Sequence, residues 1–201
     1  AISAADRHKD LRYAATIHHG IRIEDFAFDA RGSDDLLFFG RIHPDKGAAE
    51  AIRVAKAAGL RLHLYGIVQD KGYFEREVEP HVDGEQIVWH GPVGGEARIK
   101  ALGNARAMLH LIDFDEPFGL SVVEAMACGT PVIAIHRGSM PELITDGVTG
   151  FLVRNSDEAV EALEQIGEIS RRACRTSVEE RFTAQAMARK YLALYRTILE
   201  G

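Results

Sequence analysis

Short apolar runs alternate with helix-like stretches along most of this chain, and this alternation restricts its fold more than any other feature. Leu36 to Phe39 form a compact apolar run, and the next stretch carries Ala48, Ile52 and Ala55 at three- and four-residue steps before Gly59. A buried strand followed by an amphipathic helix is the repeating unit of a parallel sheet covered by helices. The sequence therefore predicts an α/β fold, a Rossmann-like, doubly wound parallel sheet of about six strands.

The same pattern places the individual elements. Strands are predicted at residues 36–39, 61–65, 87–89, 108–112, 131–135 and 150–153. Helices are predicted at residues 48–58, 73–78, 96–102 and 119–127, and from residue 183 to the carboxyl end. Ser156 is the predicted N-cap of a further helix, because the acidic residues Asp157 and Glu158 follow it and complement the positive end of the helix dipole.

Composition limits the partners of the chain more than its fold. The 201 residues carry a formal net charge of −6, which argues against a nucleic-acid partner held by a general basic surface. Cys128 and Cys174 lie far apart in stretches predicted to be helical, so they suit a reducing compartment rather than a disulfide framework. No apolar run approaches the roughly 20 residues that span a bilayer. We expect a cytoplasmic protein without a transmembrane segment.

The first candidate site follows the first predicted strand and reads Gly40-Arg41-Ile42-His43-Pro44-Asp45-Lys46-Gly47. Open parallel sheets bind ligands beyond the carboxyl ends of their strands. Gly40 permits close backbone approach, and Arg41 offers a planar donor fork for phosphate oxygens. Lys46 lies at the start of a predicted helix, where anions are favoured. The spacing does not match a Walker P-loop, and a solvated cationic turn is the alternative interpretation.

The second candidate site follows the fourth predicted strand, where Glu116-Pro117-Phe118-Gly119-Leu120 leads into a helix that contains Glu124. Glu116 stays in the loop and Glu124 lies about one turn into the helix, so both carboxylates can face one crevice. The amides of residues 118–120 are predicted to lie beside them at the helix N-terminus. Because carboxylates accept hydrogen bonds from hydroxyl pairs, this arrangement describes a nucleoside diphosphate sugar site. Alternatively, the acids only stabilise the helix dipole.

These motifs make the chain resemble the carboxyl-terminal, donor-binding domain of the family 4 retaining glycosyltransferases, of GT-B architecture (glycosyl transferases group 1). The matching segments, in order, are Phe39-Gly40-Arg41, Lys46-Gly47, Glu116 to Leu120, Glu124 to Ala127, Gly129 to Val132, Gly138 to Ile144 and Asp146 to Val153. One such motif is weak support, whereas the ordered set is specific. The resemblance implies one half of a GT-B fold and transfer of a glycosyl group, of the hexosyl type, with retention of the anomeric configuration.

The resemblance also implies roles for individual residues. The implied catalytic set is Arg41, Lys46 and Glu116. The two cations would hold the diphosphate and offset charge on the departing nucleotide, and the carboxylate would contact the hydroxyls of the donor sugar. The implied donor-binding set is Gly40, Val93, Phe118, Gly119, Leu120 and Glu124, with Glu124 on the ribose hydroxyls and the base beside the loop at Val93. No cofactor is implied, and UDP is the expected nucleotide.

Three parts are expected along the chain. Residues 1–29 would be a linker and the remnant of a preceding amino-terminal domain, residues 30–180 the nucleotide-sugar-binding domain, and residues 181–201 a helix that packs back toward the preceding domain. His18-His19-Gly20-Ile21 resembles the family's linker, and the start at Ala1 suggests the middle of a longer protein. Because the acceptor-binding domain is missing, we expect the chain alone to be inactive.

Two alternative functions remain open at this point. One is another GT-B sugar-nucleotide enzyme, such as an epimerase, and the other is a non-catalytic module that binds a nucleotide sugar. Asp113-Phe114-Asp115 has the spacing of the metal-binding carboxylates in another glycosyltransferase architecture. Two carboxylates alone make a thin metal site, however, and we predict no bound metal.

Overall fold

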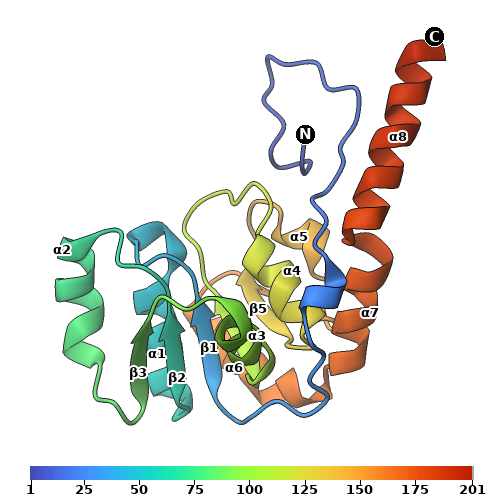
Figure 1. Cartoon of the computed structure of the whole chain (residues 1–201). Helices are drawn as coiled ribbons and strands as arrows, with labels where there is room; N and C mark the ends of the chain where they lie inside the picture. The colour runs from blue at the N-terminus through green and yellow to red at the C-terminus, as the bar shows by residue number, and fades with distance from the viewer. Residues whose placement is uncertain (201) are drawn as a thin grey trace.

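The computed structural model describes residues 1–200 and contains a sheet of six parallel strands (Figure 1). The strands are β1 (Leu36–Phe39), β2 (Leu62–Tyr65), β3 (Ile87–Gly91), β4 (Ala107–His110), β5 (Val132–Ile135) and β6 (Gly150–Val153). Their spatial order is β3-β2-β1-β4-β5-β6, and every pairing is parallel. The predicted doubly wound sheet is confirmed. The chain order reverses between β1 and β4, which is where such sheets open a crevice for ligands.

Helices cover both faces of the sheet. The longer ones are α1 (Ala48–Ala58), α3 (Gly95–Gly103), α4 (Leu120–Ala127), α6 (Ser156–Gln165), α7 (Arg171–Arg181) and α8 (Ala184–Glu200). The short ones are η1 (Ile23–Asp25), η2 (Pro44–Lys46), α2 (Lys71–Tyr73), η3 (Phe74–Val78), η4 (Glu79–His81), α5 (Met140–Leu143) and η5 (Ile166–Glu168). Helix α1 packs beside α6 on one face, and α4 packs beside α3 and α7 on the other.

The fourth strand is shorter than the apolar run that predicted it. It ends at His110, although Leu111 and Ile112 are also buried, each with 2% of its surface exposed. The Asp113 N–H donates a hydrogen bond to the Asp45 carbonyl oxygen at 2.9 Å. This bond turns the chain toward η2 and away from the neighbouring strand. The predicted strand at 108–112 is therefore too long at its carboxyl end, because burial continues after the strand pairing has stopped.

Two helix predictions also need correction. Helix α6 is capped by Asn155, whose side-chain oxygen accepts from the Glu158 N–H at 3.0 Å, and Ser156 is the first helical residue. The prediction of Ser156 as the N-cap is wrong by one position, because the extended Asn155 reaches this amide first. The helix predicted at 73–78 is instead a succession of short α, π and 3₁₀ turns over residues 71–81.

A tight junction brings the two candidate motifs together. Gly47 links η2 to α1 with a φ of 73°, and a Cβ atom there would lie 1.9 Å from the Leu111 carbonyl oxygen. Only glycine combines this left-handed conformation with so close an approach. The loop that carries Lys46 is therefore packed directly on the loop that follows β4.

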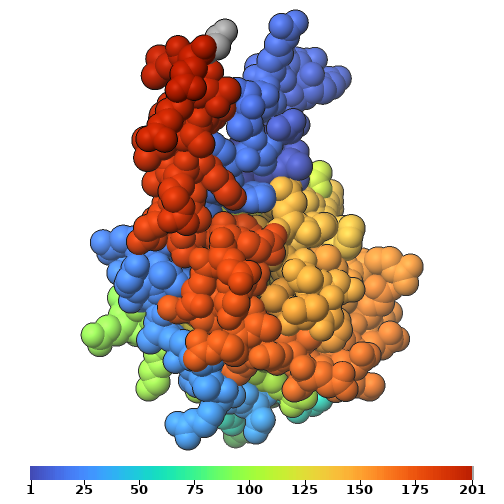
Figure 2. All heavy atoms as spheres, turned by 90° about the vertical axis from the view of Figure 1, so that its right-hand side faces the viewer, coloured from blue at the N-terminus to red at the C-terminus, as the bar shows by residue number. Residues whose placement is uncertain are grey.

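Hydrogen bonds join the segment that precedes η1 to the start of α8. The Ile21 N–H donates to the Phe182 carbonyl oxygen at 2.9 Å, and the Ala184 N–H donates to the Ile21 carbonyl oxygen at 2.8 Å. Beyond this bridge, residues 1–16 and α8 both extend away from the sheet and lie side by side (Figures 1 and 2). The division of the chain near residues 29 and 180 stays a prediction. Within residues 1–200, none of the helices combines the length and apolar character that a membrane crossing requires.

Candidate functional site

A cavity of about 560 Å³ opens beyond the carboxyl ends of β1 and β4. We call it the switch-point cavity. Its lining includes every residue of the two predicted sets, namely Gly40, Arg41, Lys46, Val93, Glu116, Phe118, Gly119, Leu120 and Glu124. The fold thus brings these residues to one place, and their roles toward a ligand stay predictions. Ile2, His19 and Arg98 also line the cavity and were not in either set.

Lys46 and Glu116 form an ion pair inside the switch-point cavity. Lys46 Nζ lies 2.5 Å from Glu116 Oε2, and the two side chains are only 13% and 14% exposed. The lysine ammonium also lies 4.5 Å from the centre of the Phe114 ring, a cation–π contact. Glu116 and Phe114 therefore fix the position of the Lys46 ammonium group in the absence of a ligand.

His110 stands behind this ion pair at the end of β4. It is 5% exposed, and its Nε2 lies 3.6 Å from Glu116 Oε2 without a hydrogen-bond partner of its own. Burial by itself would raise the pKa of Glu116, but the neighbouring His110 imidazole and Lys46 ammonium lower it to about 2. Glu116 is consequently an ionised hydrogen-bond acceptor at neutral pH.

Glu124 has a different cationic partner, Arg98 from the first turn of α3. The Arg98 guanidinium forms an ion pair with the Glu124 carboxylate. Glu124 is buried, with 7% of its surface exposed. Burial raises the pKa of Glu124, and the contact with Arg98 offsets this only in part. The arginine guanidinium also lies 5.8 Å from the centre of the Phe39 ring. Arg98 thus connects α3 with α4 across the cavity.

Arg41 and the start of α4 complete the polar lining. Arg41 is exposed, and its guanidinium donates to the Gln69 side-chain oxygen. Gly119 precedes α4 with a φ of 94°, and a Cβ atom there would lie 2.8 Å from Met140 Cε. The helix begins at the cavity, and the backbone N–H groups of Leu120 and Ser121 in its first turn have no acceptor within the helix. These amides and Arg41 supply hydrogen-bond donors beside the two carboxylates.

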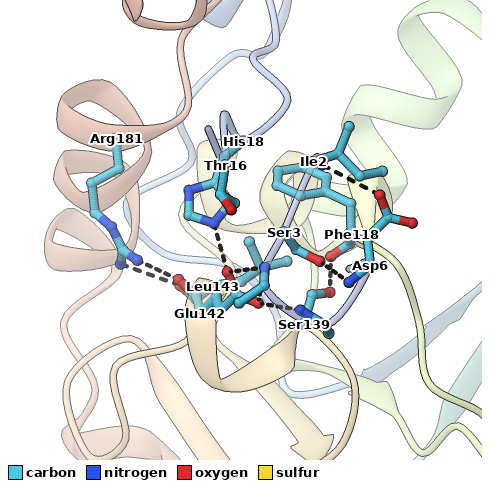
Figure 3. Close-up of polar contacts among 12 residues, drawn as sticks. Ile2, Ser3, Asp6, Thr16, His18, Phe118, Ser139, Glu142, Leu143 and Arg181 are labelled. Carbon is cyan, nitrogen blue, oxygen red and sulfur yellow. Dashed lines mark hydrogen bonds and ion pairs between the residues drawn. The ribbon is translucent and has the colours of Figure 1, made fainter. Parts of the chain in front are cut away.

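The amino-terminal segment closes one side of the cavity through Ile2 and His19. It is held by Glu142 of α5, whose carboxylate accepts from the Ala4 N–H at 2.9 Å and contacts His18 Nε2 at 2.8 Å (Figure 3). Arg181 donates to the Glu142 carbonyl oxygen. The segment therefore docks onto the α5 and α7 region through one carboxylate residue.

The two aspartates of the Asp113-Phe114-Asp115 stretch contact one arginine. Arg137 Nη1 lies 2.8 Å from Asp113 Oδ1, and Arg137 Nε lies 3.0 Å from Asp115 Oδ1. Both carboxylates are exposed and share this single arginine as their ion-pair partner. Within residues 1–200, no group of three or more histidine, cysteine, aspartate or glutamate side chains is arranged to hold a metal ion.

The chain is similar in sequence to several bacterial proteins. An uncharacterised protein from the cps region of Klebsiella pneumoniae is 30% identical over 169 residues, covering 81% of this chain and 46% of its own length. A D-inositol 3-phosphate glycosyltransferase of Streptomyces griseus is 27% identical over 188 residues, covering 74% of this chain and 39% of its own length. The chain therefore spans about half the length, or less, of these relatives.

Solved structures share the fold. AviGT4, a glycosyltransferase involved in avilamycin A biosynthesis, superposes with a TM-score of 0.83 at 28% identity, covering 100% of this chain and 63% of its own. HepE of Anabaena, solved with UDP and glucose, superposes with a TM-score of 0.78 at 20% identity, covering 90% of this chain and 56% of its own. The sequence profile of the glycosyl transferases group 1 family matches residues 23–183. Because this match covers most of the chain, the protein belongs to the glycosyl transferases group 1 family.

Proposed function

We propose that this chain is the donor-binding domain of a retaining glycosyltransferase and that its switch-point cavity binds a nucleoside diphosphate sugar, with UDP as the nucleotide. The observation that carries the proposal is the convergence of two carboxylates, three cationic side chains and a helix N-terminus in one cavity. Cations and helix amides suit a diphosphate. Carboxylates suit hydroxyl groups of ribose and sugar. A nucleotide sugar presents both kinds of group.

The proposed roles follow from the position of each group. Arg41 and Lys46 bind the diphosphate and stabilise the charge that develops on the leaving nucleotide. Glu116 accepts hydrogen bonds from the hydroxyls of a donor hexose, and Glu124 accepts from the ribose. The base lies beside Val93, and the backbone at residues 118–120 contacts the sugar and phosphate.

The relatives support this proposal at the level of reaction class. The Streptomyces griseus relative is named a glycosyltransferase, and HepE was solved with UDP-glucose as well as with UDP. Because the chain covers about half of such proteins, we propose that an acceptor-binding domain precedes it in the whole enzyme and that the chain alone does not transfer sugar. We also propose a cytoplasmic location, since the thiols of Cys128 and Cys174 are buried and unpaired.

Calorimetric titration with UDP, GDP and ADP tests the site. We expect UDP to bind and Glu124→Ala to weaken its binding about 10- to 100-fold, because a hydrogen bond to a charged group contributes roughly 1.5–3 kcal/mol. Glu164→Ala is the matched control, an exposed carboxylate on α6, which covers the face opposite α4. Equal UDP affinity in the parent and the Glu124→Ala variant would refute the assignment of Glu124 to the ribose.

The reaction class needs a separate experiment, because an epimerase and a non-catalytic module would also bind the nucleotide. The chain joined to its preceding domain is incubated with a UDP-hexose, with and without acceptor sugars, and the products are identified by NMR. A new glycosidic bond with the donor's anomeric configuration supports the proposal. Isomerised UDP-hexose identifies an epimerase, and unchanged nucleotide sugar identifies a binding module.

A further inference from the structure

A second cavity lies at the opposite edge of the sheet, beside the residues that precede β1, β4 and β5. Its volume is about 680 Å³, compared with about 560 Å³ for the switch-point cavity. Its walls come from the segment around residues 28–34, from Arg106, and from the junction between η5 and α7. In Figure 2 these light-blue and orange segments meet on the lower part of the molecule. It is separate from the proposed donor site.

Four arginines line this second cavity, and we call it the arginine pocket. They are Arg31, Arg106, Arg171 and Arg172, and Asp34 is the one carboxylate among its lining residues. Within residues 1–200, none of these four arginines forms an ion pair with a carboxylate; the arginines that do so lie elsewhere in the chain. The chain as a whole has 30 acidic and 24 basic residues. The pocket is therefore a local excess of positive charge on an acidic protein.

The half-buried members of the cluster, Arg106 and Arg171, are held mainly by backbone oxygens rather than by carboxylates. Arg171 donates to the carbonyl oxygens of Asp29, Ala105 and Gly103 at 2.8, 2.7 and 2.5 Å. The nearby Asp29 carboxylate is engaged elsewhere, since it accepts from the backbone N–H groups of Arg31 and Gly32. Arg171 also donates to Thr130 Oγ1 at 3.1 Å. These contacts fix the position of the Arg171 guanidinium, which forms no ion pair within residues 1–200, although the charge of the nearby Asp29 carboxylate acts on it.

Arg106 has a donor with no acceptor. Its Nη2 donates to the Leu163 carbonyl oxygen at 3.3 Å, while its Nε is buried and has no hydrogen-bond partner. A charged donor that is removed from water without an acceptor is unfavourable. Helix α7 begins at Arg171, so the positive end of its dipole faces the same pocket. An anion in the pocket would lie beside guanidinium groups that have no ion-pair partner and beside a helix N-terminus.

We propose that the arginine pocket is a second binding site, for a phosphate dianion that is either free phosphate or the phosphate group of a monoester. A tetrahedral dianion accepts several hydrogen bonds at once, and the planar guanidinium fork matches pairs of its oxygens. The volume of the pocket falls within the range of about 300–1,000 Å³ that is common for small-molecule sites. The site and its ligand are independent of the donor-binding proposal.

NMR and calorimetry on the 201-residue chain test this proposal with inorganic phosphate and AMP as probes, at constant ionic strength set with chloride. We expect a saturable shift of the Arg106 Nε–H resonance and at least a ten-fold loss of affinity in Arg106→Gln. Arg53→Gln is the matched control, because Arg53 is paired with Glu50 on α1. Affinities for the pocket are read from the Arg106 Nε–H shift, because AMP can also enter the switch-point cavity. Tighter binding of AMP than of phosphate by this signal identifies a monoester as the ligand, and the reverse order identifies free phosphate.

A second set of variants keeps the test independent of folding and of the donor site. Arg31→Gln changes an exposed arginine of the pocket and is also expected to weaken binding. Glu124→Ala should leave phosphate binding in the pocket unchanged, and Arg106→Gln should leave UDP binding unchanged. A linear, non-saturating response of the Arg106 signal, or equal affinity in the parent, Arg31→Gln and Arg106→Gln, would overturn the proposal.

Discussion

Glu116 and Glu124 line the same cavity, but their surroundings act on the two negative charges in opposite directions. Lys46 and His110 lower the pKa of Glu116 to about 2, against the raising effect of burial. Burial raises the pKa of Glu124 despite its contact with Arg98. One carboxylate is therefore ionised at neutral pH, whereas burial makes the other less acidic than an ordinary glutamate side chain.

The lowered pKa of Glu116 predicts how stability depends on pH. The folded protein holds this carboxyl proton less tightly than the unfolded chain does, so the ionised Glu116 stabilises the fold above the ordinary pKa of 4.5. This contribution is lost as the pH falls from 4.5 toward about 2. We expect the difference in unfolding free energy between the parent and Glu116→Gln to be largest near neutral pH and to shrink over that window.

Urea unfolding followed by circular dichroism, at pH values from about 7 down to about 3, measures this difference. Glu164→Gln is the control, since that exposed carboxylate has no ion-pair partner within residues 1–200 and should show no such pH-dependent difference. A Glu116→Gln difference that stays constant across the pH range would contradict the role given to the Lys46 pair.

Motif spacing predicted which residues share the cavity but not how they pair. The rule that strand ends meet at one edge of a parallel sheet predicted a common site for the Gly40–Lys46 and Glu116–Glu124 segments, and the family resemblance added Val93. Arg98 was missed because it contacts Glu124 across 26 positions of sequence, through the packing of α3 on α4. The available signal was its position in the first turn of a helix predicted to follow the Val93 loop. His110 was predicted only as part of the strand at residues 108–112, with no role in the site.

At the scale of elements, the order of strands and helices was readable from the sequence, whereas several ends were not. Apolar runs record burial, and burial in this chain continues past β4 into Leu111 and Ile112. The end of the strand depends instead on the hydrogen bond between Asp113 and Asp45, which belong to different loops. Local residue preferences cannot report a bond of this kind, because it exists only after the loops have packed.

The two glycines that flank α1 allow a matched test of the junction between the candidate motifs. Gly47 and Gly59 have similar φ angles of 73° and 66°, but a Cβ atom at Gly47 would strike the Leu111 backbone while one at Gly59 meets nothing within 4 Å. We expect Gly59→Ala to cost about 1–2 kcal/mol, from the left-handed conformation alone. Gly47→Ala should cost clearly more and should also weaken UDP binding.

Thermal and urea unfolding of the two variants measure the cost, and titration with UDP measures the effect on the site. The comparison isolates the contact with Leu111, because the backbone conformation is nearly the same at both positions. Equal destabilisation by Gly47→Ala and Gly59→Ala would show that the Leu111 loop moves freely, and that it does not hold Lys46 in place.

For the whole molecule, α8 is the helix that leaves the most large apolar side chains exposed. Its exposed apolar residues are Leu192, Tyr195, Ile198 and Leu199. A helix with such a face is stabilised mainly by packing against other parts of a protein. Since the chain covers about half the length of its relatives, we expect a preceding domain to cover this face in the whole enzyme.

Amide hydrogen exchange tests this expectation. Residues 191–200 should exchange quickly in the 201-residue chain and become protected when the preceding domain is present, because local opening then requires the apolar face to be exposed. Residues 171–181 of α7, which already pack on α4, serve as the internal control. Unchanged exchange over residues 191–200 in the longer protein would contradict packing of α8 on that domain.

The bridge between Ile21 and the Phe182–Ala184 segment has a consequence for how such domains can be exchanged between relatives. A Cβ atom at Gly20 would lie 2.3 Å from the Thr183 carbonyl oxygen, so the two backbone segments are in close contact at that point. A chimaera cut on only one side of the bridge would combine surfaces from different parents. A domain moved into another protein should therefore carry both the segment around Gly20 and Ile21 and helix α8 from the same parent.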